Sequence, residues 1–557
     1  MKILRIFFIA VLAFILIASV AVFWVLKTID VNAYRTQISQ QVSHAIGREV
    51  EIGKIGFQFS LLNAIVLDLQ NLTVADDPQL KAIKIESIHL DLKISDLILK
   101  RRVTIANVQV HNGNFIFTDA SFNPPMTVSV NQIGFKTKNV SLTEPFSFSA
   151  QAALWNVQPN IFIEGSVAAI DVKQSQARLD NLKIRANLSD VDLEQLRKSL
   201  ASVPDLKMIR KVEGSIDVAI SQIVVGAKGL VSLSAMGEWS KGRVAVEGLS
   251  VPLDRIDVQW DIRESDIIIK KVFIGVSSGE ILMQGQLKGY QAQPHLIFNG
   301  TLKQIPVQSL MPAQSPVKVE GLIEGHLTLQ GEAPDLTALA QHLKGEGIFN
   351  VQEARLKDIN VLQTILKSIS FIPNLGGEDF AQKVEQSLPD HFKQRLNQRD
   401  TEFKKVEFKT HLEDGVLILD SGDVEAEEVK INLNGQLDMS QTLTLNGTVY
   451  IPQDLSQFIV SSAEEFSPLL DENQEIRIPL QSYQGPVDKI KMFPDMKYLA
   501  QNMMKGTAKE QLKNVIFKAL DLGGDENRGD QQNPPSQNSD EHPEKVLIEN
   551  ILDGIFK

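Results

Sequence analysis

The sequence predicts a mainly β protein built from one-sided antiparallel sheet, preceded by a transmembrane helix and completed by a few helices, most of them C-terminal. Three patterns support this prediction. Residues 6–26 form a long apolar run, apolar and polar residues alternate through most of the remaining chain, and helical spacing is concentrated after residue 336. Because successive strand side chains point to opposite faces, the alternation indicates a sheet with one apolar face and one polar face.

The composition limits the possible classes of protein. The chain has 557 residues, 43% of them apolar, which excludes wholesale disorder. Its net charge of −12 is uneven, since residues 521–544 contain seven acidic residues and one arginine. No basic stripe occurs and aromatic residues are sparse, so nucleic acid is not an expected partner. The absence of cysteine excludes disulfides and thiolate metal sites and suits an oxidising compartment.

The first 27 residues are interpreted as a membrane anchor. Ile6–Leu26 contains 21 residues with Ser19 as its only polar member, close to the roughly 20 needed to cross a bilayer. A cleaved signal peptide is the alternative, but five further apolar residues follow Ala21. We therefore expect a retained single-pass helix, with a cytoplasmic N-terminus and an exported remainder. Ile6, Phe14 and Leu26 lie along this expected anchor, the first and the last of them at its two ends.

The stretch Val429–Ile451 gives the clearest β-hairpin. Its apolar set alternates with polar residues on both sides of a turn at 438–441, and consists of Val429, Ile431, Leu433, Leu437, Leu443, Leu445, Val449 and Ile451. A loop of three or five residues pairs Leu437 with Leu443 and keeps both halves on one face. The same register places Leu433 opposite Gly447 and Leu445 opposite Gly435, so each large side chain faces a gap.

Further strands and helices follow from the same periodicities. Strands are expected at residues 50–59, 65–74, 83–94, 103–119, 126–136, 146–154 and 161–169. In the third of them, the apolar members Ile88, Leu90, Leu92 and Ile94 alternate with polar residues. Helices are expected at 30–46, 191–200, 336–342, 358–370, 378–397, 454–461 and 495–520. The first helix follows the anchor directly, so it could lie on the bilayer or close the end of the sheet.

A degenerate phrase of one apolar residue, one polar residue and one glycine recurs from residue 212 onward. Its glycines are Gly214, Gly248, Gly300, Gly321, Gly435 and Gly447. The irregular spacing argues against a propeller or a fixed-period solenoid. Glycine within a strand marks a bend, a bulge or a close approach, so we expect a long sheet that is repeatedly curved.

The C-terminal tail has two parts. Residues 523–544 have no apolar side chain and are rich in acidic and amide residues, which predicts a disordered linker. Residues 545–557 carry a compact helical stripe that includes Leu547, Ile551, Leu552 and Ile555. Because so short a helix is marginal in water, it implies a docking surface on its own sheet, on a partner or on a membrane.

No catalytic constellation is evident, and neither a metal nor a cofactor is expected. Gly275–Gly279 matches the nucleophile-elbow pattern, but the residues after it read as a strand, so we interpret it as a hairpin turn. The nine histidines lack a metal-binding spacing, and His89 and His111 are placed on polar strand faces. Residues 76–78 are interpreted as a turn rather than a calcium site.

Several segments resemble the AsmA family of inner-membrane-anchored periplasmic proteins. N-terminally these are the anchor, Ile29–Val31, Tyr34-Arg35 and Gly47–Ile52; C-terminally they are Leu343–Gly347, 359–370, 403–419, the hairpin, Ile478–Leu480 and Gly485–Val487. The resemblance implies a bridge-like lipid-transfer protein, in which a long, curled antiparallel sheet forms a β-groove for acyl chains. It implies phospholipids and the inner membrane as partners, and a role in lipid transport to the outer membrane or its homeostasis. The acidic linker and final helix fall outside it.

The residues alone leave two folds open. The apolar face must be covered by a second sheet, by helices or by a ligand, so the alternation does not separate a series of β-sandwiches from a groove, and the residues alone slightly favour the sandwiches. The resemblance favours the groove, with a module at 28–210, a middle segment at 211–335 and a C-terminal module at 336–522. A non-enzymatic lipid carrier is the expected function. The alternative is a scaffold or assembly factor that recruits an envelope protein through the C-terminal tail.

Overall fold

The computed structural model describes most of the chain between residues 35 and 503. The described ranges are 35–46, 48–60, 64–76, 80–93, 105–120, 124–140, 144–171, 176–200, 206–226, 229–290, 293–312, 315, 317–334, 336–364, 386–438, 442–462, 464–486, 492 and 494–503. The expected anchor, Ile94, the acidic linker and the final helix lie outside these ranges. None of the helices within them is long and apolar enough to cross a membrane.

The chain divides into two compact units. Unit 1 comprises Met1–Glu247 with Asp254–Lys270, and unit 2 comprises Gly248–Leu253 with Lys271–Lys557. The division between the units falls within two strands. It lies after the first residue of β11 (Leu253–Arg263) and in the middle of β12 (Asp266–Val276). The described residues form 22 strands and few helices, so the expected mainly β class is confirmed.

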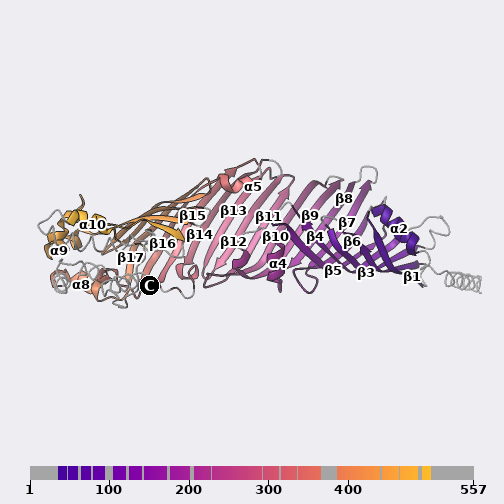
Figure 1. The fold of residues 1–557 in the computed structure, drawn as a ribbon, viewed down its shortest axis with the longest axis horizontal. Helices are drawn as coiled ribbons and strands as arrows, with labels where there is room; N and C mark the ends of the chain where they lie inside the picture. The colour runs from indigo at the N-terminus through magenta and orange to yellow at the C-terminus, as the bar shows by residue number, and fades with distance from the viewer. Residues whose placement is uncertain are drawn as a thin grey trace, which may run out of the picture. The chain divides into compact units, whose positions relative to one another are not determined.

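Unit 1 is an antiparallel meander in which each strand from β1 to β10 pairs with the next one in sequence (Figure 1). Its strands are β1 (Val50–Ser60), β2 (Ala64–Val74), β3 (Leu80–Lys93), β4 (Ile105–Asp119), β5 (Met126–Lys138), β6 (Phe146–Leu154), β7 (Ile161–Asp171), β8 (Gln176–Asn187), β9 (Ile209–Gly226) and β10 (Gly229–Val246). Its helical segments are α2 (Arg35–Ile46), α4 (Leu193–Ser199) and η2 (Leu206–Met208).

Unit 2 continues the same topology. Its strands are β13 (Gly279–Lys288), β14 (His295–Pro306), β15 (Lys318–Glu332), β16 (Leu343–Lys357), β17 (Thr401–Glu413), β18 (Val416–Ala426), β19 (Lys430–Leu437), β20 (Thr442–Ile451), β21 (Ile476–Pro479) and β22 (Tyr483–Pro486). Both β21 and β22 pair with β20, one at each end of it. The helical segments are η3 (Val307–Ser309), α5 (Leu336–Leu339), η4 (Ala340–His342), α8 (Asp390–Leu396), α9 (Gln453–Ser462), η5 (Glu464–Leu469) and α10 (Met496–Met503).

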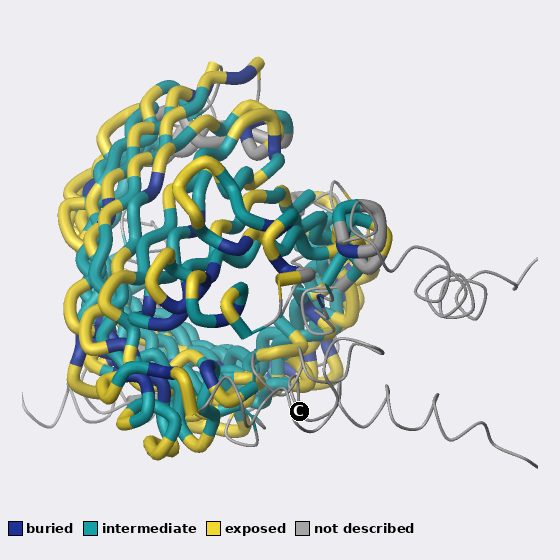
Figure 2. Tube along the Cα trace, turned by 90° about the vertical axis from the view of Figure 1, so that its left-hand side faces the viewer, coloured by how far each residue is buried: buried dark blue, intermediate teal, exposed yellow. Residues whose placement is uncertain are grey.

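The sheet of each unit is curled and not closed (Figure 2). In the described pairings β1 bonds only to β2, and β22 bonds only to β20. Each sheet therefore keeps an open edge and two separate faces.

The hairpin register predicted from the alternation is confirmed. Leu437 pairs with Leu443, Leu433 with Gly447, and Gly435 with Leu445. A Cβ on Gly435 would lie 3.2 Å from Leu445 Cδ1, and one on Gly447 would lie 3.0 Å from Leu433 Cδ2. The large side chains thus lean over the glycines opposite them.

The recurring glycines do not share one role. Gly300, Gly435 and Gly447 occupy regular register positions within strands. Gly214 and Gly321 have φ angles of 127° and 139° and lie beside register shifts, where the extra residue bends the strand. Gly248, with φ 89°, lies in the turn after β10 rather than within a strand.

Two other sequence-based expectations have clear outcomes. Residues 277–278 form a turn between β12 and β13, so the interpretation of Gly275–Gly279 as a hairpin turn is confirmed. The continuous helix expected over 378–397 is wrong in its described part, because residues 388–389 are not helical and α8 begins only at Asp390. Pro389 explains the interruption, since proline lacks the amide hydrogen and restricts the residue before it.

Candidate functional site

The apolar residues of unit 1 line up across the strands as well as along them. One continuous row of paired residues crosses ten strands, β1 to β10, in the order Ile55, Leu69, Ile88, Val110, Phe135, Ala150, Ile163, Ile184, Val218 and Gly237. Paired residues in an antiparallel sheet share a face, so all ten project to the same side. The row contains no polar residue.

Unit 2 has equivalent rows. One crosses nine strands in the order Gly285, Phe298, Leu329, Gly345, Leu412, Leu417, Leu437, Leu443 and Gly485. A second, four residues away along most of these strands, runs through Ile281, Leu302, Gly325, Phe349, Phe408, Gly422, Leu433 and Gly447. With the row between them, in which Thr410 pairs with Gly347, these rows form a largely apolar face where glycines alternate irregularly with phenylalanine and leucine.

The apolar face is packed at one end of each unit and left uncovered elsewhere by the described residues. In unit 1, Ile38 and Val42 of α2 pack on the cluster that contains Val50, Ile52 and Leu72. In unit 2, helices α8, α9, η5 and α10 build a cluster at the last strands. Its buried members are Leu362, Leu388, Phe392, Ile451, Leu455, Ile459, Phe466, Leu469, Ile476 and Leu499.

Away from these ends, most apolar side chains are only half-buried, although Leu182, Ile220 and Ala235 form a small buried cluster on β8–β10 of unit 1. Leu433, Leu437, Leu443 and Leu445 all have intermediate exposure, and Leu417 in the same face is 41% exposed. The core of a β-sandwich would bury such residues almost completely, because the two inner faces interdigitate. The structure therefore decides between the two folds that the sequence left open: each unit presents a groove-like apolar face.

The opposite face is polar. The row next to the apolar row of unit 1 runs through Asp68, His89, Gln109, Lys136, Ser149, Glu164 and Lys183. His89 Nδ1 lies 3.0 Å from Asp68 Oδ1, and the His89 and His111 ring centroids are 5.2 Å apart. This agrees with the placement of both histidines on polar strand faces. Phe162 and Met236 are apolar exceptions on this face, 44% and 58% exposed.

Most of the groove residues chosen from the sequence lie on the apolar face. Ile88, Leu90 and Leu92 occupy three successive rows of unit 1. In unit 2, the apolar face of β19 and β20 contains Ile431, Leu433, Leu437, Leu443, Leu445 and Val449. Val429 differs, because it lies before β19 and is only 1% exposed, so it offers almost no surface to a ligand.

The sequence patterns do not identify the other residues of these rows, which lie outside Ile88–Leu92 and Ile431–Val449. Phe135 and Phe148, for example, lie on the apolar face of unit 1 with ring centroids 5.9 Å apart. Their strands were expected, but register shifts within β4–β5 and β5–β6 change the phase of the alternation. Bulges of this kind leave little trace in the sequence except an occasional glycine or asparagine.

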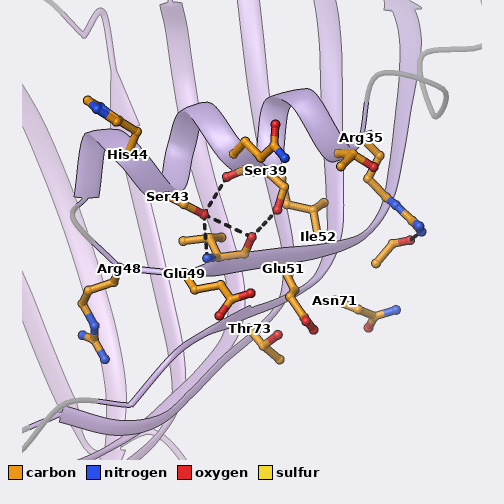
Figure 3. A pocket seen from close by; sticks show the side chains of 14 residues that line it. Arg35, Ser39, Ser43, His44, Arg48, Glu49, Glu51, Ile52, Asn71 and Thr73 are labelled. Carbon is orange, nitrogen blue, oxygen red and sulfur yellow. Dashed lines mark hydrogen bonds between the residues drawn. The ribbon is translucent and has the colours of Figure 1, made fainter.

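A cleft of about 1070 Å³ lies where α2 meets the first strands (Figure 3). Arg35, Ser39 and Ser43, spaced by four residues on one side of α2, bond to the β1 backbone. Arg35 Nη1 donates to Gly53 O at 2.8 Å, Ser39 Oγ donates to Val50 O, and Val50 N donates to Ser43 Oγ at 2.8 Å. These contacts cover part of the open edge of β1, which would otherwise offer unpaired backbone groups.

Local pairing and burial explain the pKa shifts of two carboxyl groups, those of Asp261 and Glu428. Lys270, 2.7 Å from Asp261, lowers the pKa of that carboxyl, and Arg263 at 3.2 Å contributes further. Burial raises the pKa of Glu428, which lies in the turn between β18 and β19. Across the described ranges, no group of three or more His, Asp and Glu side chains is arranged to hold a metal ion.

The fold and this face define a class of protein: an antiparallel β-groove with one apolar and one polar face. The chain belongs to the YhdP family, since the family model described as YhdP protein matches residues 1–357. The match ends with β16, whereas the same apolar rows continue through β17–β20 in unit 2. This family is not known as enzymatic. No curated protein and no solved structure matches the chain.

Proposed function

We propose that this protein is a non-enzymatic lipid carrier of the AsmA-like, bridge-like lipid-transfer group. It binds phospholipid acyl chains on the apolar face, is anchored in the bacterial inner membrane by residues 6–26, and supports lipid transport to the outer membrane or its homeostasis. The observation that carries the proposal is the row of ten paired residues without a polar member. Membership of the YhdP family supports it.

The mechanism requires no reacting group. Ten strands spaced by about 4.8 Å give a row roughly 45 Å long, whereas the acyl chains of one leaflet span about 15 Å, so about three chain lengths fit end to end along it. Each methylene removed from water contributes about 0.8 kcal/mol, so a dozen contribute roughly 10 kcal/mol before ordering entropy is subtracted. Head groups remain in solvent because the rows offer them no polar partner.

The proposal is tested by adding two charges to the apolar face of one hairpin. Ile431→Asp with Leu445→Asp places both carboxylates on that face. The matched control, Asn434→Asp with Gln436→Glu, adds two charges to the polar face of β19, where Asn434 Oδ1 already accepts a bond from Asn446 Nδ2 at 3.2 Å. Full-length protein purified from a bacterial envelope is analysed by native mass spectrometry, followed by lipid extraction.

We expect co-purifying phospholipids in the unmodified protein and in the control, and their loss in the apolar-face variant. Circular dichroism and urea midpoints establish that each variant is folded. Unchanged lipid content in a folded Ile431→Asp/Leu445→Asp variant refutes the proposal, as does a lipid-free unmodified protein.

The second candidate function is a scaffold that recruits an envelope protein. The apolar stripe of residues 545–557, separated from the sheet by the acidic stretch 523–544, favours it. Deletion of Asp525–Lys557 separates the two functions. A carrier keeps its lipids after the deletion, whereas a scaffold loses its partner in a crosslinking experiment on intact cells.

A further inference from the structure

Two of the four tryptophans in the chain lie together on the apolar face of unit 1. Trp239 of β10 pairs with Ile216, two residues from the Val218–Gly237 pair that ends the ten-residue row. The Trp260 ring lies over Gly237, since a Cβ at that glycine would overlap the indole. A Cβ at Gly214 would likewise overlap the Trp239 ring. Each indole therefore lies over a glycine, in space that the side chain of any larger residue at that glycine would need.

Packing, rather than hydrogen bonding, holds Trp239 in place. Its Nε1 is buried and has no hydrogen-bond partner in the described part of the chain. Trp155 behaves differently, because its Nε1 donates to Ser199 Oγ of α4 at 3.0 Å. Buried tryptophans normally find such a partner, and an unsatisfied N–H costs about 1–3 kcal/mol. The indole of Trp239 therefore contributes apolar surface rather than a hydrogen bond.

The surroundings of the pair add to this apolar area. A Cβ at Gly242 would lie 2.8 Å from Trp239 Cε2 and 2.7 Å from Cβ of the buried Ile256. Ile262, two residues after Trp260, packs on the cluster of Leu182, Ile220 and Ala235. Trp239 and Trp260 themselves remain half-buried, so part of each ring is accessible. A rigid, partly exposed aromatic surface next to a packed floor suits contact with methylene chains.

We propose that Trp239 and Trp260 form a platform on which acyl chains rest. We refer to these two residues as the tryptophan platform. This inference rests on the proposed lipid-carrying function. It specifies which residues of unit 1 contact the acyl chain. The platform positions the chain at the end of the ten-residue row, and the glycines beneath the indoles keep the rings low on the sheet.

The test uses the fluorescence of the full-length protein and a phospholipid brominated in the middle of its acyl chains, because bromine quenches tryptophan only at contact. Trp24 lies in the expected anchor and is replaced by phenylalanine in every variant. Trp24→Phe with Trp155→Phe leaves only the platform. Trp24→Phe with Trp239→Phe and Trp260→Phe leaves only Trp155, which is the matched control.

We expect the brominated lipid to reduce emission from the platform variant relative to the same lipid without bromine, and to leave the Trp155 variant unchanged. Trp239→Ala with Trp260→Ala should lower the number of co-purifying lipids, while the phenylalanine pair should retain them. Lipid that co-purifies but quenches neither platform tryptophan overturns this inference and leaves the proposed function standing. A protein that binds no lipid at all overturns both.

Discussion

Leu455 and Leu445 provide an internal test of whether the apolar face is uncovered in the protein without lipid. Both are leucines of unit 2, ten residues apart in sequence. Leu455 in α9 is 0% exposed and belongs to the helical cluster with Phe392 and Ile459. Leu445 in β20 is half-buried on the apolar face.

The expected losses of stability differ because only one substitution leaves a cavity. Leu455→Ala removes a fully enclosed side chain and should cost about 2–5 kcal/mol. Leu445→Ala removes a side chain that borders open space, so only part of its transfer free energy is lost, about 1–2 kcal/mol, without a cavity term. The difference between the two losses of unfolding free energy measures how far the apolar face is covered.

The assay is urea unfolding of delipidated full-length protein, followed by hydrogen exchange of peptides from residues 442–462. These peptides contain both sites, so the same cooperative unit reports both substitutions. Phospholipid should increase the cost of Leu445→Ala and leave that of Leu455→Ala unchanged, because a ligand stabilises only through its contacts with the folded state. Equal losses for the two variants without lipid would refute the open face, since a second layer would then bury Leu445 as deeply as Leu455.

Two further predictions concern groups outside the groove. Burial raises the pKa of Glu428, so its carboxyl destabilises the fold at pH values above the unfolded value of about 4.3. Glu428→Gln should therefore raise the urea midpoint at pH 7, with the gain disappearing below about pH 4; no gain at pH 7 would contradict this. At the other end, Ser39→Ala with Ser43→Ala removes bonds to Val50 and should destabilise the α2–β1 contact by about 1–2 kcal/mol, measured by hydrogen exchange of α2. Gln40→Ala, at an exposed position of the same helix, is the control, and equal protection of α2 in both variants would show that the serines do not hold it.

The local structure was largely predictable because the alternation has a short range. The strand expected at 146–154 is β6, and the register of the 429–451 hairpin follows from its apolar residues and turn length. The break at Pro389 also has a local cause, because proline cannot continue the helical spacing found on both sides of it. The residues of the long rows could not be placed, because each bulge between Ile88 and Gly237 shifts the phase of the next strand.

The sequence by itself determined that this chain forms one-sided antiparallel sheet, since the period of two specifies which side chains share a face. What covers that face was decided only by the tertiary structure. Periodicity records where an apolar side chain points, but it does not record what lies opposite, which depends on contacts between residues far apart in the chain. In unit 1 a helix packs on the first strands, in unit 2 helices pack on the last strands, and most other residues of the apolar rows in each unit remain half-exposed. That difference in burial turns a predicted sheet into a candidate groove.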